Sequence, residues 1–390
     1  MLFRGVLSSF KRECRAIFSD RLYLAVVLLL PLLMTLFFGV MFYRGTIRDL
    51  PIVVVDRDNS SMSRKLCSMI DATPGVDIAF IEQSITEAES LMLSGEVVAI
   101  AYIDDGFERD IYSGVKTSVQ CYLLGTNISA SGIVEQNIEQ VVETFSAGIA
   151  LEKLQNLGVS PAQAMVYMMP VKVKYNIISN PYLNYGYYLA PIFMIMGVII
   201  FTILSSIYAI GRELRYGTAM EWMVSSGSSL LLGLVGKLLP ITIFMGLISQ
   251  LIYFILFVVM GMECAGSYLY LSVATLVFIL AYQAVAIALI SITANLRLAL
   301  SLGGGYGVMA FTFSGITFPT MAMFGIARLL SKLFPLTYFS EVFIDQATRG
   351  TPIHYDIEPL LYMLLFLLLI PLSWRRLAKV VTCEKCWGGE

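Results

Sequence analysis

LYLAVVLLLPLLMTLFFGVMFY, residues 22–43, carries no charged side chain. About 20 apolar residues in a helix are enough to cross the hydrocarbon core of a bilayer. Arg44 follows this stretch in place of a small-x-small cleavage motif, so it is interpreted as a retained first transmembrane helix and not as a cleaved signal peptide.

The rest of the chain has the composition of a membrane protein. Its 390 residues are 57% hydrophobic and 14% charged, against about 25% charged residues in soluble domains. Five further apolar stretches are long enough to cross a membrane: residues 185–210, 230–259, 268–294, 298–324 and 359–377. The sequence therefore predicts an α-helical polytopic membrane protein with six transmembrane helices.

Basic residues predict the orientation of the spans. Residues 1–21 contain five of them, Arg4, Lys11, Arg12, Arg15 and Arg21, so the positive-inside rule places the N-terminus in the cytoplasm. Six spans return the tail, residues 378–390, to the same side. The long segment 44–184 between the first two spans is then extracytoplasmic.

The pattern of this inserted segment predicts a mixed α/β domain. Short apolar runs with β-branched residues alternate with amphipathic ones. Strands are expected at 52–55, 76–81, 97–103, 116–123 and 171–177, and helices from Ser60 to Ile70, at 86–93 and 128–157, and again from Ser160-Pro161. From Arg44 to Tyr182 there are 10 Lys and Arg against 17 Asp and Glu, which indicates a solvated surface or, alternatively, one that selects basic ligands.

The spans argue against two functional classes. Ion-coupled transporters need ionisable groups near the middle of the membrane, and four of these spans have none. Lys237 is the charged residue inside a span, and we expect its ammonium group to extend to the inner interface. No phosphate-binding G-x-x-x-x-G-K-[ST] motif is present, so the chain is not itself expected to be an ATPase.

The predicted inner segment 211–229 begins GRELRYGTAMEW, residues 211–222. Gly217 permits a sharp turn, and Thr218 with Glu221 matches a capping box at the start of a helix. A short rigid helix at the membrane surface would suit a docked partner. An ordinary connecting loop with positive-inside arginines explains the same residues equally well.

This segment resembles the coupling motif of bacterial type-2 ABC exporter permeases, in Arg212-Glu213, Gly217-Thr218 and Glu221. The order of one span, a large outer domain and five spans is similar to that family over essentially the whole chain. Residues 101–110 in the outer domain and Pro335 to Tyr338 before the last span are also similar to family segments.

The resemblance implies two permease subunits, identical or different, in the bacterial inner membrane with a separate ATPase that binds ATP and Mg²⁺. It implies no catalytic, cofactor or metal site in this chain. The implied coupling residues are Arg212, Glu213, Arg215, Gly217, Thr218 and Glu221. Phe10, Lys11, Arg12 and Arg15 belong to an amphipathic segment that would lie at the interface, its basic residues on lipid phosphates. A periplasmic adaptor is a further partner to consider.

Three more groups of residues have expected roles in a transport path, an outer gate and the tail. A transport path between subunits would be lined by hydroxyls of the second and fifth spans, Thr202, Ser205, Ser206, Thr312, Ser314 and Thr317, although helix packing explains them as well. Glu341, Asp345 and Arg349 in the outer segment 325–358 are four residues apart, which suits an outer gate or a surface ion pair. Cys383 and Cys386 are expected to be reduced thiols of the cytoplasmic tail.

The leading hypothesis is a permease that exports a hydrophobic or amphiphilic compound, such as a drug or a lipid-like molecule. The alternative is a membrane anchor whose outer domain holds envelope or secretion machinery without transport. A secondary transporter ranks third because the spans lack coupling charges. A net charge of −2 gives no support to a nucleic-acid partner.

Overall fold

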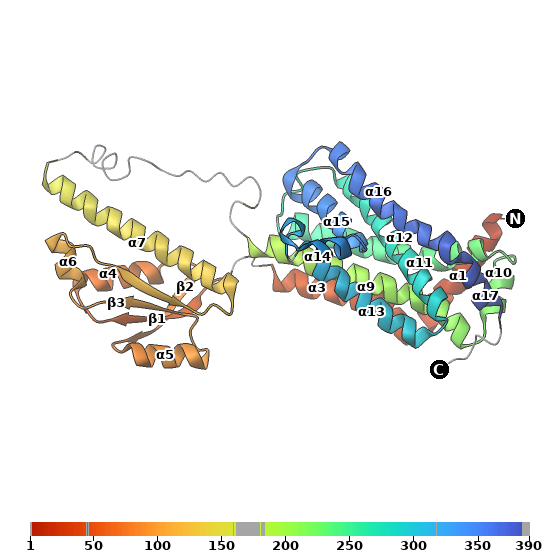
Figure 1. Ribbon diagram of the computed structural model, residues 1–390, viewed down its shortest axis with the longest axis horizontal. Helices are drawn as coiled ribbons and strands as arrows, with labels where there is room; N and C mark the ends of the chain where they lie inside the picture. The colour runs from red at the N-terminus through yellow and green to blue at the C-terminus, as the bar shows by residue number, and fades with distance from the viewer. Residues whose placement is uncertain are drawn as a thin grey trace. The chain divides into compact units, whose positions relative to one another are not determined.

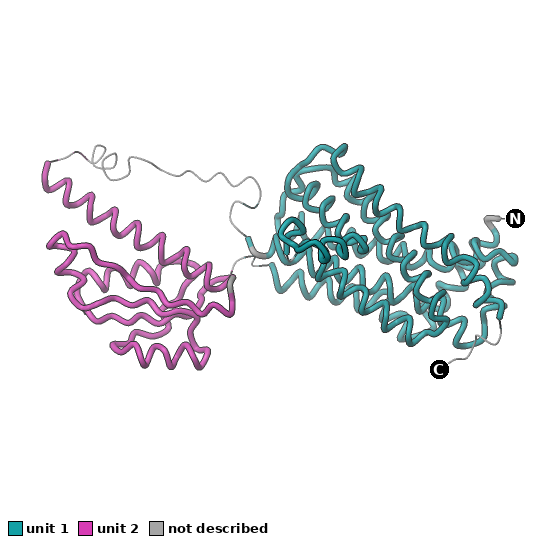
Figure 2. The backbone as a smooth tube through the Cα atoms, viewed as in Figure 1, with its two compact units in different colours: residues 1–45, 177–390 teal, residues 46–176 magenta. Residues whose placement is uncertain are grey.

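The computed structural model describes residues 2–43, 45, 47–158, 160, 180, 184–316 and 318–383. The chain divides into two compact units (Figure 2). One unit combines Met1–Gly45 with Ile177–Glu390, and the other is Thr46–Asn176. Each unit is described by itself.

The Thr46–Asn176 unit is built on a four-stranded sheet in the order β2-β1-β3-β4. β1 pairs in parallel with β2 and β3, and β4 is antiparallel to β3. The strands are β1 (Leu50–Asp56), β2 (Val76–Glu82), β3 (Ala99–Ile103) and β4 (Val119–Leu123), and the helices are α4 (Ser61–Asp71), α5 (Ile85–Ser94), α6 (Phe107–Ser113) and α7 (Ile128–Asn156).

Alternating side chains of β1 bury both faces of this sheet. Ile52 and Val54 pack with the helices on one face, α4, α6 and α7, whereas Val53 and Val55 pack with α5 on the other (Figure 1). A strand directs successive side chains to opposite faces, so a continuous apolar run fits a strand covered on both sides. The helix expected from Ser160-Pro161 and the strand expected at 171–177 lie outside the described residues.

Within the described residues of the other unit, six helical segments are long and apolar enough to cross a membrane, as the sequence predicts. They are Arg21–Met41, Gly186–Arg215, Leu230–Val259, Tyr268–Thr293, Leu296–Phe313 and Ile353–Thr382. The first span consists of α2 (Arg21–Leu24), the π-helical η1 (Ala25–Leu29) and α3 (Leu30–Met41). The second is α9 (Tyr185–Arg215), the third is α11 (Leu230–Phe254) with η2 (Ile255–Val259), the fourth is α12 (Tyr268–Thr293) and the fifth is α13 (Leu296–Phe313). The sixth includes α16 (Ile357–Leu365), η6 (Phe366–Leu368) and α17 (Leu369–Thr382).

Shorter helices complete this unit. They are α1 (Leu2–Ser19), α10 (Ala219–Ser225), the turn η3 (Thr320–Ala322), α14 (Gly325–Ser331), α15 (Pro335–Ile344) with the π-helical η4 (Asp345–Arg349), and the turn η5 (Ile353–Tyr355).

Two helix ends differ from the sequence-based boundaries. α13 ends at Phe313 and not near residue 324, because Gly315 adopts a left-handed φ of 89° and Pro319 follows. α9 continues to Arg215, five residues beyond the predicted span. Arg212, Glu213 and Arg215 therefore lie in the last turn of a helix and not in a loop.

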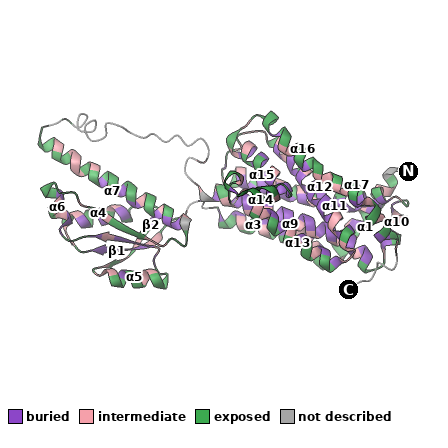
Figure 3. Cartoon of the chain, viewed as in Figure 1, coloured by how far each residue is buried: buried purple, intermediate pink, exposed green. Residues whose placement is uncertain are grey.

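α12 forms the centre of the membrane unit, where it packs against α9, α11, α13, α15 and α17. Its residues Ala281, Ala284 and Ala286 are fully buried, and their small side chains allow neighbouring helices to approach closely. Figure 3 shows the buried residues along the inner faces of these helices, with the exposed ones outside. α9 packs between α12 and α13 and extends through the length of this core.

Candidate coupling site

Lys237 of α11 lies at the meeting point of four helices. Its side chain is 2% exposed, and its ammonium group contacts the carboxylates of Glu13 in α1 and Glu213 in α9, the latter at 2.8 Å. The same ammonium lies over the ring of Trp222 in α10, 5.1 Å from the ring centroid. We call Glu13, Glu213, Trp222 and Lys237, with Arg12, the lysine cluster.

Charges within the lysine cluster balance. Arg12 of α1 donates a hydrogen bond from Nη2 to Oε2 of Glu213 at 2.9 Å, so two cations face two carboxylates. The hydroxyl of Tyr23 donates to Glu13, which satisfies a further acceptor. A buried charge is tolerated when it is both paired and hydrogen-bonded, as these groups are.

This arrangement corrects two expectations. Lys237 does not extend its ammonium to an interface; Glu13 and Glu213 hold it inside the protein because they offer stronger compensation than partial hydration. The guanidinium of Arg12 is expected on lipid phosphates, but it binds Glu213 and lies 3.7 Å from Glu221. Lys11 and Arg15 of the same helix are exposed, and Phe10 is half-buried.

The predicted capping box at Thr218 is wrong. Thr218 has φ −97° and ψ 12°, which is not the extended backbone of a capping residue, and its side chain does not cap α10. Its hydroxyl donates instead to Oε2 of Glu213, and its backbone N–H donates to the carbonyl of Glu213 at 3.0 Å. The turn relies on Gly217, whose φ is 69°. Thr218 therefore fastens the turn to the lysine cluster.

α10 has one fixed face and one open face. Ala219 and Trp222 are buried, and the indole N–H of Trp222 donates to the carbonyl of Gly233 in α11 at 3.3 Å. On the other side Met220 and Val224 are 47% and 70% exposed, and the Glu221 side chain is 74% exposed. This exposed face combines two apolar side chains with a carboxylate and is held rigidly from beneath.

α1 crosses α11 at very short range. A Cβ at Gly236 would lie 2.5 Å from the backbone oxygen of Val6 and 2.7 Å from Cβ of Ser9, so the crossing needs glycine. The Ser9 hydroxyl donates to the carbonyl of Gly233 at 3.0 Å. Figure 1 shows α1, α10 and α17 at the same end of the unit, which we call the coupling end.

Asp20 joins α1 to the first span at this end. Its carboxylate accepts backbone N–H groups of Leu22 and Tyr23 and, at 2.8 Å, the hydroxyl of Tyr208 in α9. Partial burial by itself would raise the pKa of Asp20, but these hydrogen bonds outweigh it and lower the pKa below its ordinary value. Asp20 is therefore held ionised as the cap of α2.

The structure thus brings together four of the predicted coupling or interfacial residues, Arg12, Glu213, Thr218 and Glu221. Arg215 is exposed with its guanidinium 5.9 Å from the ring centroid of Tyr216, and Arg212 is half-buried. Sequence reasoning missed Glu13, Trp222 and Lys237 as one cluster. The available signal was one lysine inside a span, with an acidic residue in each of two segments that adjoin predicted spans.

The predicted path-lining residues have mixed positions. Thr202, Ser205, Ser206 and Ser314 are buried within this single chain, and Thr312 is exposed. Ser205, Thr312 and Ser314 donate hydrogen bonds to carbonyls of the preceding turn, as helix packing predicts. Thr317 and Cys386 lie outside the described residues, and Cys383 follows the end of α17.

The predicted outer pair forms. Arg349 donates to Asp345 at 2.9 Å within η4, and Arg349 is 66% exposed, so the bond resembles a surface ion pair. Desolvation raises the pKa of Glu341 above its ordinary value, and the neighbouring carboxylates Asp345, Glu358 and Asp356 raise it further. Four carboxylates and one paired cation, Arg349, thus lie close together here.

No group of three His, Cys, Asp or Glu suited to a metal ion occurs among the residues that the structure describes. A family model described as ABC-2 family transporter protein matches residues 21–374. The comparison with curated proteins found no match.

Proposed function

Because the chain belongs to the ABC-2 family of transporter proteins, we propose that it is the permease subunit of an ATP-driven exporter, which pairs with a second permease subunit and couples to a separate ATPase through the exposed face of α10. Family membership makes the chain the membrane component of an ABC transporter and implies an ABC ATPase as partner. The direction of transport, the pairing of subunits and the docking face are proposals.

The observation that carries the proposal is the exposed face of α10. Met220, Glu221 and Val224 lie three and four residues apart, so one side of the helix presents them together. Helices of this kind bind in grooves of partner proteins through their apolar side chains, with charges at the rim. Glu221 would pair there with a basic group of the ATPase.

A displacement of α10 would reach two membrane helices, α9 and α11, and the N-terminal helix α1 through the lysine cluster. Trp222 contacts Lys237, and Lys237 bridges α11 to α1 and to the end of α9. Buried ion pairs hold their partners in fixed geometry, since separating them exposes an unpaired buried charge. The cluster therefore moves these helices as one body when the ATPase changes shape.

The proposal is tested by isolating the chain with its ATPase. The expected result is a stable complex that hydrolyses ATP and moves an apolar compound across a vesicle membrane. If the chain purifies without any ATPase, transports nothing and retains envelope proteins through residues 46–176, the exporter proposal is wrong and the scaffold hypothesis is correct.

A further inference from the structure

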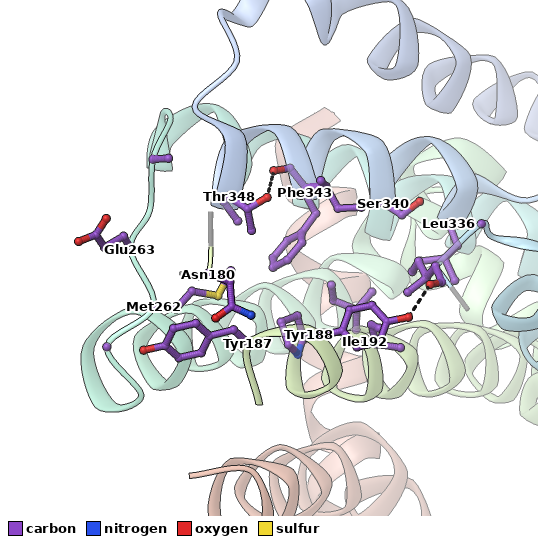
Figure 4. A pocket seen from close by; sticks show the side chains of 18 residues that line it. Asn180, Tyr187, Tyr188, Ile192, Met262, Glu263, Leu336, Ser340, Phe343 and Thr348 are labelled. Atoms are coloured by element: carbon purple, nitrogen blue, oxygen red, sulfur yellow. Dashed lines mark hydrogen bonds between the residues drawn. The ribbon is translucent and has the colours of Figure 1, made fainter. Parts of the chain in front are cut away.

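A cavity of about 490 Å³ lies within the membrane unit at the N-terminal half of α9 (Figure 4). Asn180 and four separate segments form it: the start of α9, the loop Gly261–Ala265 after η2, residues 315–316 after α13, and α15 with η4. Small-molecule sites occupy about 300–1,000 Å³. Close-packed protein interiors leave few voids larger than a water molecule, so a space of this size requires an explanation.

The floor of the cavity is apolar. Ile192 and Ile195 of α9 face Leu336 and Phe343 of α15, with further apolar side chains from the other segments. An apolar cavity holds water poorly because few partners are available for its hydrogen bonds. Contact with an apolar molecule would remove this surface from water and is the favourable way to fill it.

Hydroxyl groups at the wall are already engaged. Tyr187 donates to the carbonyl of Met260 at 2.9 Å, Tyr188 to that of Ile316 at 3.1 Å, and Thr348 to that of Ile344 at 2.6 Å. Figure 4 draws the Tyr188 and Thr348 bonds along the cavity wall. These three hydroxyls have no remaining proton to offer a ligand, so shape, apolar contact and charge are the means of recognition.

The walls are held in place by Gln346, which lies in η4 and is fully buried. Its side-chain oxygen accepts the backbone N–H of Ser267 at 2.8 Å, and its amide nitrogen donates to the carbonyl of Thr351 at 2.9 Å. Its backbone oxygen accepts the N–H of Gly266 at 2.8 Å. The loop before α12 and the outer segment are thus tied together, and the cavity is preformed.

Charge near the cavity is negative. Among the described residues that line it, Glu263 carries the single formal charge, and Figure 4 shows this carboxylate at the edge, pointing away from the cavity. The neighbouring carboxylates Glu341, Asp345, Asp356 and Glu358 outnumber the one cation in contact with them, Arg349, which pairs with Asp345. An anionic molecule would be repelled by this field, whereas a cation would be attracted.

We propose that this cavity binds a compact apolar molecule that is neutral or positively charged, and that it is the site at which each permease subunit holds its cargo. This inference rests on the proposed exporter function and adds the class of compound. α9 connects the site to the lysine cluster, since Tyr187 and Glu213 lie about 40 Å apart along one helix. Pro191, within the cavity wall, breaks the hydrogen-bond ladder of α9 there and allows that helix end to bend.

The test uses two probes of nearly equal size and shape and opposite charge, tetraphenylphosphonium and tetraphenylborate. Binding to the full-length chain in phosphatidylcholine nanodiscs is measured by equilibrium dialysis, with empty nanodiscs subtracted. We expect saturable binding of the phosphonium at one site per chain and at least tenfold weaker binding of the borate. Equal binding of both probes would contradict the charge assignment.

Location is tested by filling the cavity. Thr348→Trp places a large ring in it and should weaken phosphonium binding at least tenfold, whereas Leu333→Trp, an exposed position outside the lining, should leave it unchanged. Glu263→Gln should reduce the preference for the phosphonium over the borate. Size-exclusion chromatography confirms that each variant is folded. Unchanged binding in a folded Thr348→Trp variant would overturn the proposal.

Two further measurements distinguish the cargo site from a lipid site and from the proposed exporter function. If a phospholipid remains bound through purification and the probe binds only after its removal, the cavity is a lipid site and the cargo assignment is wrong. ATP turnover with the ATPase is measured on the same preparations. If the chain binds the probe but no ATPase associates with it, the exporter function is wrong and the cavity assignment stands. If the complex hydrolyses ATP but the chain does not bind the probe, the cavity assignment is wrong and the exporter function stands.

Discussion

At the scale of single residues, Lys237 has the largest predicted effect on stability. Lys237→Met leaves Glu13 and Glu213 buried with one cation, Arg12, which pairs with Glu213. Removing one partner of a buried ion pair costs about 3–5 kcal/mol, because the remaining charge is uncompensated. The midpoint of thermal unfolding of the purified chain should therefore fall markedly, as followed by tryptophan fluorescence.

Two controls identify the cause. Lys332→Met changes an exposed lysine of the same unit and should have little effect. Adding Glu13→Gln and Glu213→Gln to Lys237→Met removes both orphaned charges and should restore much of the lost stability. If the triple variant is no more stable than Lys237→Met, the lysine is not needed for charge compensation.

The same residue shows the limit of inference from sequence. Residue 237 is recognisable as a charge in a span, but a sequence gives no distance to Glu13, which is 224 positions away along the chain. Interfacial extension and internal pairing are both favourable for a lysine near a helix end. The geometry of α1 and α9 decides between them.

At the scale of elements, the crossing of α1 and α11 depends on Gly236. Gly236→Val places methyl groups where the backbone of Val6 and the side chain of Ser9 lie, so α1 must move away. Hydrogen exchange of the α1 amides should become faster, because its contact with α11 is lost. Gly246→Val on the same helix is the matched control, since a Cβ there meets nothing within 4 Å. Equal exchange in both variants would contradict the crossing.

α4 begins at a cap that can be tested locally. Ser60 and Ser63 bond reciprocally to each other's backbone N–H groups, at 3.1 and 3.0 Å. Ser60→Ala removes this cap at a cost of about 1 kcal/mol. Amide exchange in the first turn of α4 should speed up about fivefold, whereas Ser90→Ala, which alters an exposed hydroxyl within α5, should leave that turn unchanged. No change on Ser60→Ala would show that the cap is not formed in solution.

Elements were predictable where one periodicity dominates. The six spans follow from long apolar stretches, and β1 follows from the buried run at Ile52 to Val55. The end of α13 was misplaced because residues 314–324 are apolar enough to continue a span, although Gly315 and Pro319 end the helix. The start of α10 was predicted from a capping-box pattern, but Thr218 lacks the extended backbone of a capping residue, and its hydroxyl donates to Glu213.

At the scale of the whole molecule, α9 connects two features at opposite ends of one helix. Its last turn joins the lysine cluster, and its first turns form part of the cavity wall. Beyond Pro191 the helix can carry a displacement because its backbone hydrogen bonds resist extension. Cargo in the cavity and a push at α10 would therefore influence one another through α9.

The central claim is that the exposed face of α10 couples the chain to its ATPase, and the charge reversal Glu221→Lys tests it most directly. Its matched control is Glu89→Lys, an exposed glutamate of α5 in the other unit. Co-purification with the ATPase and ATP turnover are measured for both variants. The account predicts that Glu221→Lys lowers ATPase retention and turnover at least tenfold while Glu89→Lys behaves as the unaltered chain. Unchanged retention and turnover in Glu221→Lys would contradict it.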